Sequence, residues 1–396
     1  MENTTMAEHG ISTKNALRFV VLIGIVSLFA DMTYEGARSI NGPFLAILGA
    51  SGVVVGVVSG LGELIGFSIR LVSGYFSDKT KSYWAITFFG YAINLIAVPL
   101  LALAGNWQIA AVLMIVERIG KGIRVPPRDA MLSYATQQMG RGWGFGLHEA
   151  LDQLGAITGP LIVAAVLYFR DGYKTGYTLL LVPALLALSV LTAARFLYPR
   201  PQDLEFSQTK LQFQGFSKSF WLYVAAAALI AAGFADFPLI AYHFQKASIA
   251  SETMIPVLYA IAMGVDAVAA LAFGRLFDRI GLSTMMLVAL LTAFFAPLVF
   301  FGNFPLAMLG MAFWGIGMGA QESIMRAAIG GMIAPEQRGT AYGLFNTVYG
   351  AAWFLGSVLI GVLYDVSIPW LVAFSVAAQL ASIPIFFVLR QRMQHE

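Results

Sequence analysis

The sequence predicts an all-α integral membrane protein in which twelve transmembrane helices form two six-helix bundles, related as a parallel pseudo-twofold repeat. Three observations predict this fold. The chain of 396 residues is 59% hydrophobic and 11% charged, whereas soluble domains are roughly 45 to 50% apolar and about 25% charged. Its apolar residues form about twelve segments that can each cross roughly 30 Å of hydrocarbon at about 20 residues per crossing. Two loop motifs also occur twice, once in each half of the chain.

The composition excludes several classes of function. The chain has no cysteine, which rules out disulfides, thiolate metal sites and thiol chemistry. Its net charge of +3 is not gathered into a basic patch with interleaved aromatic residues, so we expect no nucleic-acid partner. We find neither an ATP-binding Gly-x-x-x-x-Gly-Lys-Ser/Thr loop nor a nucleophile in register with a base. The chain is therefore not expected to be an enzyme.

The predicted spans follow one another with short connections. They are residues 17–45, 51–77, 82–104, 107–127, 143–169, 175–197, 218–245, 252–277, 283–302, 305–332, 339–364 and 368–390. The first apolar run is longer than the core of a signal peptide, so it is interpreted as a retained span. The longest polar interruption, residues 198–217, is a predicted linker between an N-terminal bundle (1–197) and a C-terminal bundle (218–396).

Lysine and arginine residues predict the orientation. They collect at the ends of the spans on the side that holds both termini and the linker, while the other side has only Arg170, Lys174 and Lys246. Basic loops stay in the cytoplasm. We therefore expect a multi-pass protein of the cell inner or plasma membrane with both termini and the linker in the cytoplasm.

The two repeated motifs indicate an internal duplication. Residues 74–79 (GYFSDK) end the second span, and residues 274–279 (GRLFDR) end the eighth, 200 positions later. Residues 141–146 (RGWGFG) match residues 338–343 (RGTAYG) at a separation of 197 positions. Matching loops on the same side of the membrane predict six spans followed by six in a parallel repeat, which is an architecture of transporters.

The fourth span carries a stripe of charge. Glu117, Lys121, Arg124 and Arg128 fall within roughly 40° of one direction at about 100° per residue, with Arg118 adjoining them. A charge in hydrocarbon costs about 2.5 to 3.5 kcal/mol on insertion scales, so this stripe should face other helices or a water-filled path.

A proline pair interrupts the same span. Pro126 and Pro127 predict a break in the helix. The break would leave Arg128 and Asp129 at the cytoplasmic mouth. Glu117, Arg118 and Lys121 then rank above Arg124 for a central role.

Other spans also place ionisable residues at depth. Asp31, Glu35 and Arg38 share one face of the first span, where Arg38 can neutralise one carboxylate and leave the other ready to take up a proton near neutral pH. The remaining candidates are His148, Glu149 and Asp152 in the fifth span, Asp236 and His243 in the seventh, Asp266 in the eighth, and Glu322 and Arg326 in the tenth. A structural ion pair explains any one of them as well as a transport role does. As a set they predict a polar path between the halves.

These motifs resemble the major facilitator superfamily of secondary transporters. Its loop signature, Gly-x-x-x-Asp-Arg/Lys-x-Gly-Arg/Lys, is matched by Gly74, Asp78 and Lys79 and again by Gly274, Asp278, Arg279 and Gly281, although Lys81 replaces a glycine in the first copy. Residues 118–122 (RIGKG) are similar to the family's Arg-x-x-Gln-Gly, with Lys121 in place of Gln. Gly155, Gly159 and Pro160 match the Gly-x-x-x-Gly-Pro of its antiporter branches. The resemblance implies alternating access, with the duplicated loops as a cytoplasmic gate whose ion pairs break and reform.

The hypothesis that follows is a proton-coupled carrier that exports an amphipathic small molecule, such as a drug or a siderophore-like metabolite. One alternative is proton-coupled uptake of an organic anion held by Arg38, Arg118, Lys121 and Arg326. Another is export of a divalent metal or a metal chelate, with Asp31, His148, Asp152, Asp236 and His243 as candidate ligands. A receptor or scaffold without transport would not explain the duplicated gate motifs. We expect a monomer in the lipid bilayer that binds a small-molecule substrate and uses protons as the coupling ion, without a cofactor.

Overall fold

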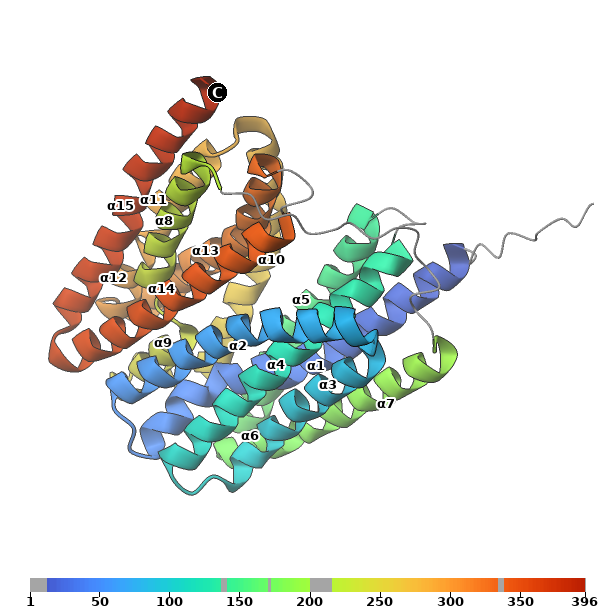
Figure 1. Ribbon diagram of the computed structural model, residues 1–396. Coiled ribbons are helices and arrows are strands. Elements are labelled where there is room, and N and C mark those ends of the chain that lie inside the picture. Colours follow the sequence, from blue (N-terminus) through green and yellow to red (C-terminus); the bar gives the residue numbers. More distant parts are fainter. Residues whose placement is uncertain (1–12, 137–140, 170–171, 200–215, 334–337, 396) are drawn as a thin grey trace, which may run out of the picture.

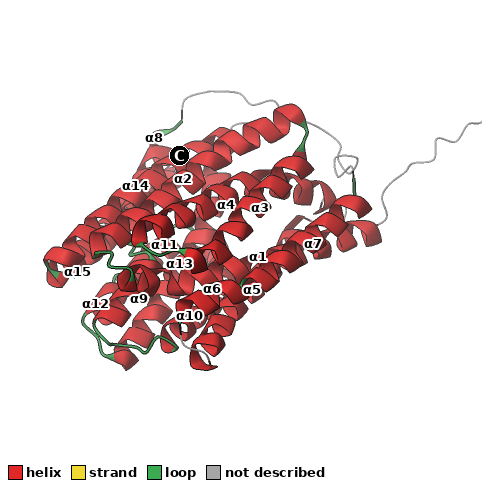
Figure 2. Cartoon of the chain, turned by 90° about the horizontal axis from the view of Figure 1, so that it is seen from below, coloured by secondary structure: helices red, strands yellow, loops and turns green. Residues whose placement is uncertain are grey.

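A computed structural model of the chain describes residues 13–136, 141–169, 172–199, 216–333 and 338–395. The first half contains α1 (Thr13–Ile47), α2 (Gly52–Thr80), α3 (Tyr83–Leu100) with a short 3₁₀ turn η1 (Leu101–Leu103), α4 (Trp107–Thr136), α5 (Arg141–Phe169), α6 (Tyr173–Leu179) and α7 (Leu181–Leu197). The second half contains α8 (Lys218–Gly233), α9 (Phe237–Lys246), α10 (Met254–Ile280), α11 (Ser283–Thr292), α12 (Phe295–Phe300), α13 (Phe304–Met332), α14 (Arg338–Val366) and α15 (Ile368–His395). The described residues contain no strand (Figure 2).

These helices form twelve rods, because α6 with α7, α8 with α9, and α11 with α12 each make one span of the predicted pattern. Ten rods are long and apolar enough to cross a membrane within the described ranges. The other two are α4, with its stripe of charge, and α13. The predicted all-helical membrane fold is confirmed. At the majority of helix ends, the observed bound lies within a few residues of the predicted one.

The helices of the first half lie at the lower right of Figure 1 and those of the second half at the upper left. We call the end of the molecule that holds residues 47–52 the outer end, and the end where α7 stops and α8 starts the linker end. In both views α2 runs beside α14 (Figures 1 and 2), and α1 packs against α9 while α5 packs against α10. These helix pairs form the interface between the two halves of the chain.

The outer end is closed by direct contacts between the halves. The backbone amides of Gly52 and Val53 donate to the carboxylate of Asp365 at 3.0 and 2.8 Å. Tyr242 donates its hydroxyl to the carbonyl of Ala50 at 3.1 Å. A Cβ atom at Gly56 would lie 2.4 Å from the carbonyl oxygen of Ser357, so glycine is needed where α2 crosses α14. These contacts join the two halves at the outer end.

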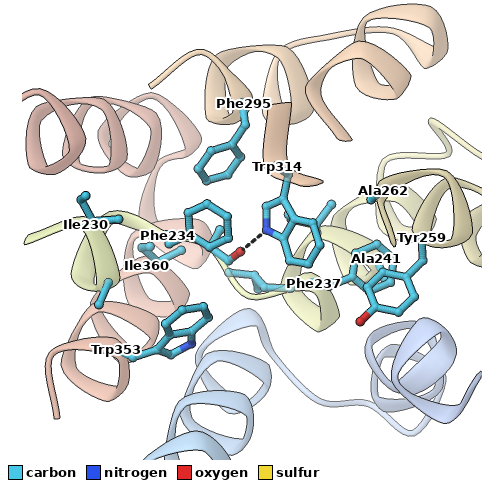
Figure 3. Packing of buried hydrophobic residues seen from close by; sticks show 14 of the residues in the cluster. Ile230, Phe234, Phe237, Ala241, Tyr259, Ala262, Phe295, Trp314, Trp353 and Ile360 are labelled. Carbon is cyan, nitrogen blue, oxygen red and sulfur yellow. Dashed lines mark hydrogen bonds between the residues drawn. The ribbon is translucent and has the colours of Figure 1, made fainter. Parts of the chain in front are cut away.

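The seventh span is interrupted between α8 and α9, and its free backbone groups are satisfied by side chains of other helices. Trp314 donates to the carbonyl of Ala235 at 2.9 Å (Figure 3), Ser375 to that of Gly233 at 2.6 Å, and Gln379 to that of Ile230 at 3.1 Å. Phe234 stacks on the Trp314 ring and packs in turn against Phe295. A broken helix persists at membrane depth only with such partners. The break places Asp236 at the start of α9.

The predicted break at Pro126 and Pro127 is wrong. The helix α4 continues to Thr136 through both prolines. Pro127 has no amide to offer the carbonyl of Ile123, but Ser73 of α2 donates its hydroxyl to that carbonyl at 2.6 Å. Arg124 is consequently buried, with 1% of its side chain exposed, and Arg128 is nearly so at 11%. Neither arginine lies at a mouth of the protein, while the Asp129 side chain is 42% exposed.

Candidate functional site

Seven ionisable side chains form a buried network beside the break in the seventh span. We call it the central network, and its members are Glu35, Arg38, Glu63, Glu117, Arg118, Lys121 and Asp236. Arg38 lies 3.9 Å from Glu35 and 3.7 Å from Glu63. Arg118 lies 3.4 Å from both Glu63 and Glu117, and Lys121 lies 3.8 Å from Glu35. Arg70 of α2 also acts on Glu63, so four carboxylates lie among four cations.

Two contacts of this network join the two halves of the chain. Arg38 of α1 donates to Asp236 at 2.6 Å, and Tyr259 of α10 donates to Glu35 at 2.5 Å. Asp236 also accepts the amide of Phe237 at 3.0 Å, so it caps α9 while it pairs with Arg38. The broken seventh span therefore holds the carboxylate in a fixed position opposite the guanidinium.

A small cavity adjoins the network. Its lining includes Asn41, Glu117, Arg118 and Asp236, and its volume of about 20 Å³ has room for about one water molecule. The side-chain amide of Asn94 in α3 donates to the carboxylate of Glu117 at 2.7 Å and so holds Glu117 in place. A water molecule here would lie between carboxylates of α4 and of α9.

A second group of polar residues lies within the N-terminal half. We call it the lateral cluster, and its members are Ser27, Asp31, Tyr91, Arg124, Arg128, Asp129, His148 and Asp152. Asp31 lies 3.8 Å from Arg124, and the Arg124 guanidinium stands over the ring of Tyr91 at 4.4 Å. His148 lies 3.5 Å from Asp152 and 2.9 Å from the hydroxyl of Ser27. The predicted stripe on α4 thus divides between two neighbouring groups.

The Gly-x-x-x-Gly-Pro motif of α5 brings α1 and α5 together. A Cβ atom at Gly155 would lie 2.3 Å from the carbonyl oxygen of Leu28 and 2.9 Å from Cβ of Asp31. One at Gly159 would lie 2.3 Å from the carbonyl oxygen of Met32. Pro160 continues the helix. Since only glycine permits this backbone contact, the motif sets the position of Asp152 beside Asp31.

Several predicted residues do not join either group. Asp266 of α10 is 2% exposed and packs against Gly319 of α13. The charges of Glu322 and Glu149 act on it. Glu149 and Glu322 are exposed. His243 is buried near the outer end and hydrogen-bonds Tyr364 at 3.1 Å. The side chain of Arg326 lies outside the described residues.

The five candidate metal ligands are divided among three places. Asp31, His148 and Asp152 belong to the lateral cluster, Asp236 pairs with Arg38, and His243 pairs with Tyr364. In the part of the chain that the structure describes, no three His, Asp or Glu side chains are arranged to hold a metal ion.

The duplicated loop motifs lie at the linker end and are apart in this conformation. Asp78 and Lys79 are exposed at the end of α2, and Asp278 and Arg279 at the end of α10. Asp78 accepts a hydrogen bond from Tyr83 at 3.3 Å. A Cβ atom at Gly274 would meet nothing within 4 Å, and one at Gly74 only Pro126 at 3.6 Å. The gate role of these motifs stays a prediction.

Sequence reasoning missed Glu63 and Tyr259. Glu63 lies between Arg38 and Arg118, and it is a single acidic residue inside an apolar span, which was a usable signal. Tyr259 gave no signal, because a tyrosine in a span is most often a packing residue. Its hydroxyl points away from the aromatic cluster in Figure 3, toward α1.

Comparison with known proteins agrees with this geometry. The profile of the Major Facilitator Superfamily matches residues 23–248 and 237–396. An uncharacterised protein of Mycobacterium tuberculosis, Rv2265, is 40% identical over 383 residues, which cover 95% of this chain and 94% of the relative. An uncharacterised MFS-type transporter of Methanocaldococcus jannaschii, MJ1317, is 26% identical over 360 residues and covers 88% of this chain and 89% of its own.

A solved structure shares the fold. The crystal structure of a POT family transporter in complex with a thioalcohol-conjugated peptide has a TM-score of 0.77 at 11% identity, over 96% of both chains. Twelve helical rods, a duplicated loop signature and a family profile that spans both halves lead to one conclusion. The chain belongs to the major facilitator superfamily and is a membrane transporter of that type.

Proposed function

We propose that the protein is a proton-coupled antiporter that exports an amphipathic small molecule, such as a drug or a siderophore-like metabolite, by alternating access. The observation that carries the proposal is the hydrogen bond between Arg38 and Asp236, which joins the two halves inside a buried network of carboxylates and cations. Ionisable groups at this depth in a membrane protein are costly and mark proton and substrate pathways. A carboxylate of this network is therefore the proposed carrier of the coupling proton.

The proton also weakens the contact between the halves. An ionised Asp236 holds Arg38 strongly, whereas a neutral carboxyl accepts only an ordinary hydrogen bond. Protonation therefore weakens the contact that holds the outer end together. In the proposed cycle the substrate binds from the linker side and leaves through the outer end as a proton enters there, and the proton is released at the linker end before the next substrate binds.

The outward direction of transport rests on the Gly155 to Pro160 motif, which resembles that of antiporters. The proposed orientation, with the linker end in the cytoplasm, rests on the distribution of lysine and arginine between the two sides. The proposed domains are the N-terminal bundle, the linker and the C-terminal bundle at the predicted boundaries.

The acidic residues toward the linker end favour a substrate with a positive charge. Asp266, Glu149 and Glu322 come from three helices, and the charges of Glu149 and Glu322 act on Asp266. Aromatic rings of Phe345, Tyr349 and Trp353 follow one another along α14. Aromatic faces and carboxylates together suit an amphipathic cation.

Uptake of an organic anion is less well supported. Arg38, Arg118 and Lys121 already lie within 4 Å of carboxylates of the central network. An anionic substrate would have to displace Glu63 or Asp236. Export of a bare divalent cation is likewise weakened by the separation of the five candidate ligands, although a chelate would still be carried as a small molecule.

Purified protein in proteoliposomes tests the proposal. The ligand is the compound that most raises the unfolding temperature in a thermal-shift screen of amphipathic small molecules. Antiport predicts that a gradient of this ligand drives protons in the opposite direction, and that Asp236→Asn abolishes this movement. Glu252→Gln is the matched control, because Glu252 is an exposed carboxylate at the outer end. Protons that move with the ligand would indicate symport instead.

A further inference from the structure

Asn94 is a polar residue inside the apolar helix α3, and both hydrogens of its side-chain amide go to one residue. The amide donates to the carboxylate oxygen Oε1 of Glu117 at 2.7 Å and to the main-chain carbonyl of Glu117 at 3.1 Å. The reverse orientation of the amide would set its oxygen against two acceptors, so the geometry fixes which atom donates. Asn94 has no exposed surface. Since a buried polar group inside a membrane span is costly, this arrangement points to a function.

The two hydrogen bonds of Asn94 have different consequences. The bond to the main-chain carbonyl would by itself be enough to join α3 to α4. The shorter bond goes to the carboxylate, and it engages Oε1 as an acceptor both when Glu117 is ionised and when it is protonated. A proton on Glu117 would therefore lie on the other oxygen, Oε2.

The cations near Glu117 are shared with other carboxylates. The charged groups that act on Glu117 or lie across the cavity from it are Arg118 and Lys121 of α4, Glu35 of α1, Glu63 of α2 and Asp236 of α9. Arg118 lies 3.4 Å from Glu117 and equally far from Glu63. Lys121 lies 3.8 Å from Glu35. If Glu117 takes up a proton, Arg118 keeps Glu63 as its partner and Lys121 keeps Glu35.

Glu117 and Asp236 line the same small cavity, whereas Glu35 and Glu63 do not. Its volume of about 20 Å³ has room for about one water molecule. The other polar residues of the lining are Asn41, Ser59 and Arg118, so a water molecule there would have several hydrogen-bonding partners. One water molecule is sufficient to pass a proton between two groups that do not touch.

We infer that Asp236 and Glu117 exchange the coupling proton through a water molecule in this cavity, and that Asn94 is the positioning residue of Glu117. The O–H bond of the Asp236 carboxyl breaks as the water gains that proton. The water gives another of its protons to Oε2 of Glu117, so the water is restored and no other reactant is needed.

The transfer links the position of the proton to closure of the outer end. Once Asp236 has given up its proton, it is ionised again and can hold Arg38 at the 2.6 Å seen here. The proton then stays on Glu117, in the N-terminal half, for release at the linker end. This is the direction that the antiport proposed above requires, and the role of the transfer in transport rests on that proposed function.

Infrared difference spectroscopy of purified full-length protein over a range of pH tests the proton on Glu117. We expect a C=O band of a protonated carboxyl that grows as the pH falls and is lost in Glu117→Gln. Asn94→Leu should keep this band but move it to higher frequency, because the C=O at Oε1 then accepts one hydrogen bond fewer. Glu252→Gln, at an exposed carboxylate of the outer end, is the control that should leave the band in place.

Two results of this measurement overturn the inference. If no carboxyl band disappears in Glu117→Gln, Glu117 does not bind the proton. If the band has the same frequency in the wild type and in Asn94→Leu, Asn94 only joins α3 to α4 and does not position the carboxyl.

A second experiment tests the path through the cavity. Val58 lines the cavity, and Val58→Leu adds a methylene group that should exclude the water. We expect ligand-driven proton movement in proteoliposomes to slow by roughly tenfold, because the two carboxylates lose the water between them. The control is Val57→Leu, since its neighbour Val57 does not line the cavity. Equal rates in both variants would overturn the transfer. If Val58→Leu does not fold, Ser59→Val fills the same cavity and replaces it.

The infrared measurement needs no ligand, so its outcome is separate from that of the flux assay. A Glu117 band that responds to Asn94→Leu, in a protein without ligand-driven proton movement, would keep the proton on Glu117 and reject the antiport mechanism. Normal antiport in a protein without a Glu117 band would overturn this inference and leave the proposed function in place.

Discussion

Arg38 and Asp236 are 198 positions apart in the chain, belong to opposite halves, and form a hydrogen bond of 2.6 Å. Asp236 is able to make this contact because the seventh span breaks immediately before it and α9 begins there. The pair is part of a buried network that also holds Glu35, Glu63 and Arg118. The predictions below test what this arrangement does.

Asp236→Asn should loosen the outer end without unfolding the protein. The amide keeps the shape of the side chain but not its charge, and Arg38 retains Glu35 and Glu63. Because the chain has no cysteine, a Ser51→Cys, Ser367→Cys pair can report closure of the outer end by the rate of cross-linking with a short bifunctional thiol reagent. We expect Asp236→Asn to lower that rate at least twofold. An unchanged rate, with Asp365→Asn as a positive control that removes the contacts to Gly52 and Val53, would mean that the pair does not hold the halves together.

Gly155→Ala should destabilise the protein. Its methyl group would lie 2.3 Å from the carbonyl oxygen of Leu28, so α1 and α5 must separate, which typically costs about 1 to 3 kcal/mol. Gly146→Ala is the control in the same helix, because a Cβ atom there meets nothing within 4 Å and alanine is the better helix former. Thermal unfolding in detergent should show a lower midpoint for Gly155→Ala and an equal or higher one for Gly146→Ala. Equal midpoints for both variants would contradict the packing role of the motif.

Ser73→Ala should destabilise the protein through α4. It removes the donor to the Ile123 carbonyl that Pro127 leaves free, and an unsatisfied buried carbonyl costs about 1 to 3 kcal/mol. Pro127→Ala restores an amide that can donate to Ile123, so the effect of Ser73→Ala should be smaller in that background. A double-mutant cycle on the free energy of unfolding measures the coupling. Additive effects would mean that Ser73 does not compensate for Pro127.

Asp31→Asn and Glu117→Gln should each abolish ligand-driven proton movement while the protein remains folded. Asp31 carries charge in the lateral cluster and Glu117 in the central network, and both are buried. Thermal unfolding verifies the fold, and a pH indicator inside proteoliposomes follows the protons. Wild-type proton movement in both variants would exclude these two carboxylates from the coupling.

The spans could be predicted from the sequence because the apolar segments themselves decide where helices lie in a membrane. The second span, expected at 51–77, is found at Gly52–Thr80. The break at the proline pair was predicted wrongly, since Ser73 on another helix supplies the missing hydrogen bond. A local rule about proline cannot include such a partner.

The candidate site was predicted only in part. The charged residues of α1 and α4 were visible in the sequence as charges within apolar segments. Their partners were not, because the pairing of Arg38 with Asp236, or of Asp31 with Arg124 instead of Arg38, depends on how helices pack. Ser27 and Tyr91 gave no signal at all, since their role depends on lying beside His148.

The movement of protons in response to the ligand tests the central claim most directly. Proteoliposomes that contain the wild-type protein and a pH indicator receive an outward gradient of the ligand found in the thermal-shift screen, with equal pH on both sides. The account predicts that protons move inward, against the flow of ligand, and that this movement is lost in Asp236→Asn. Ligand that crosses the membrane without moving protons, or together with them, would contradict it.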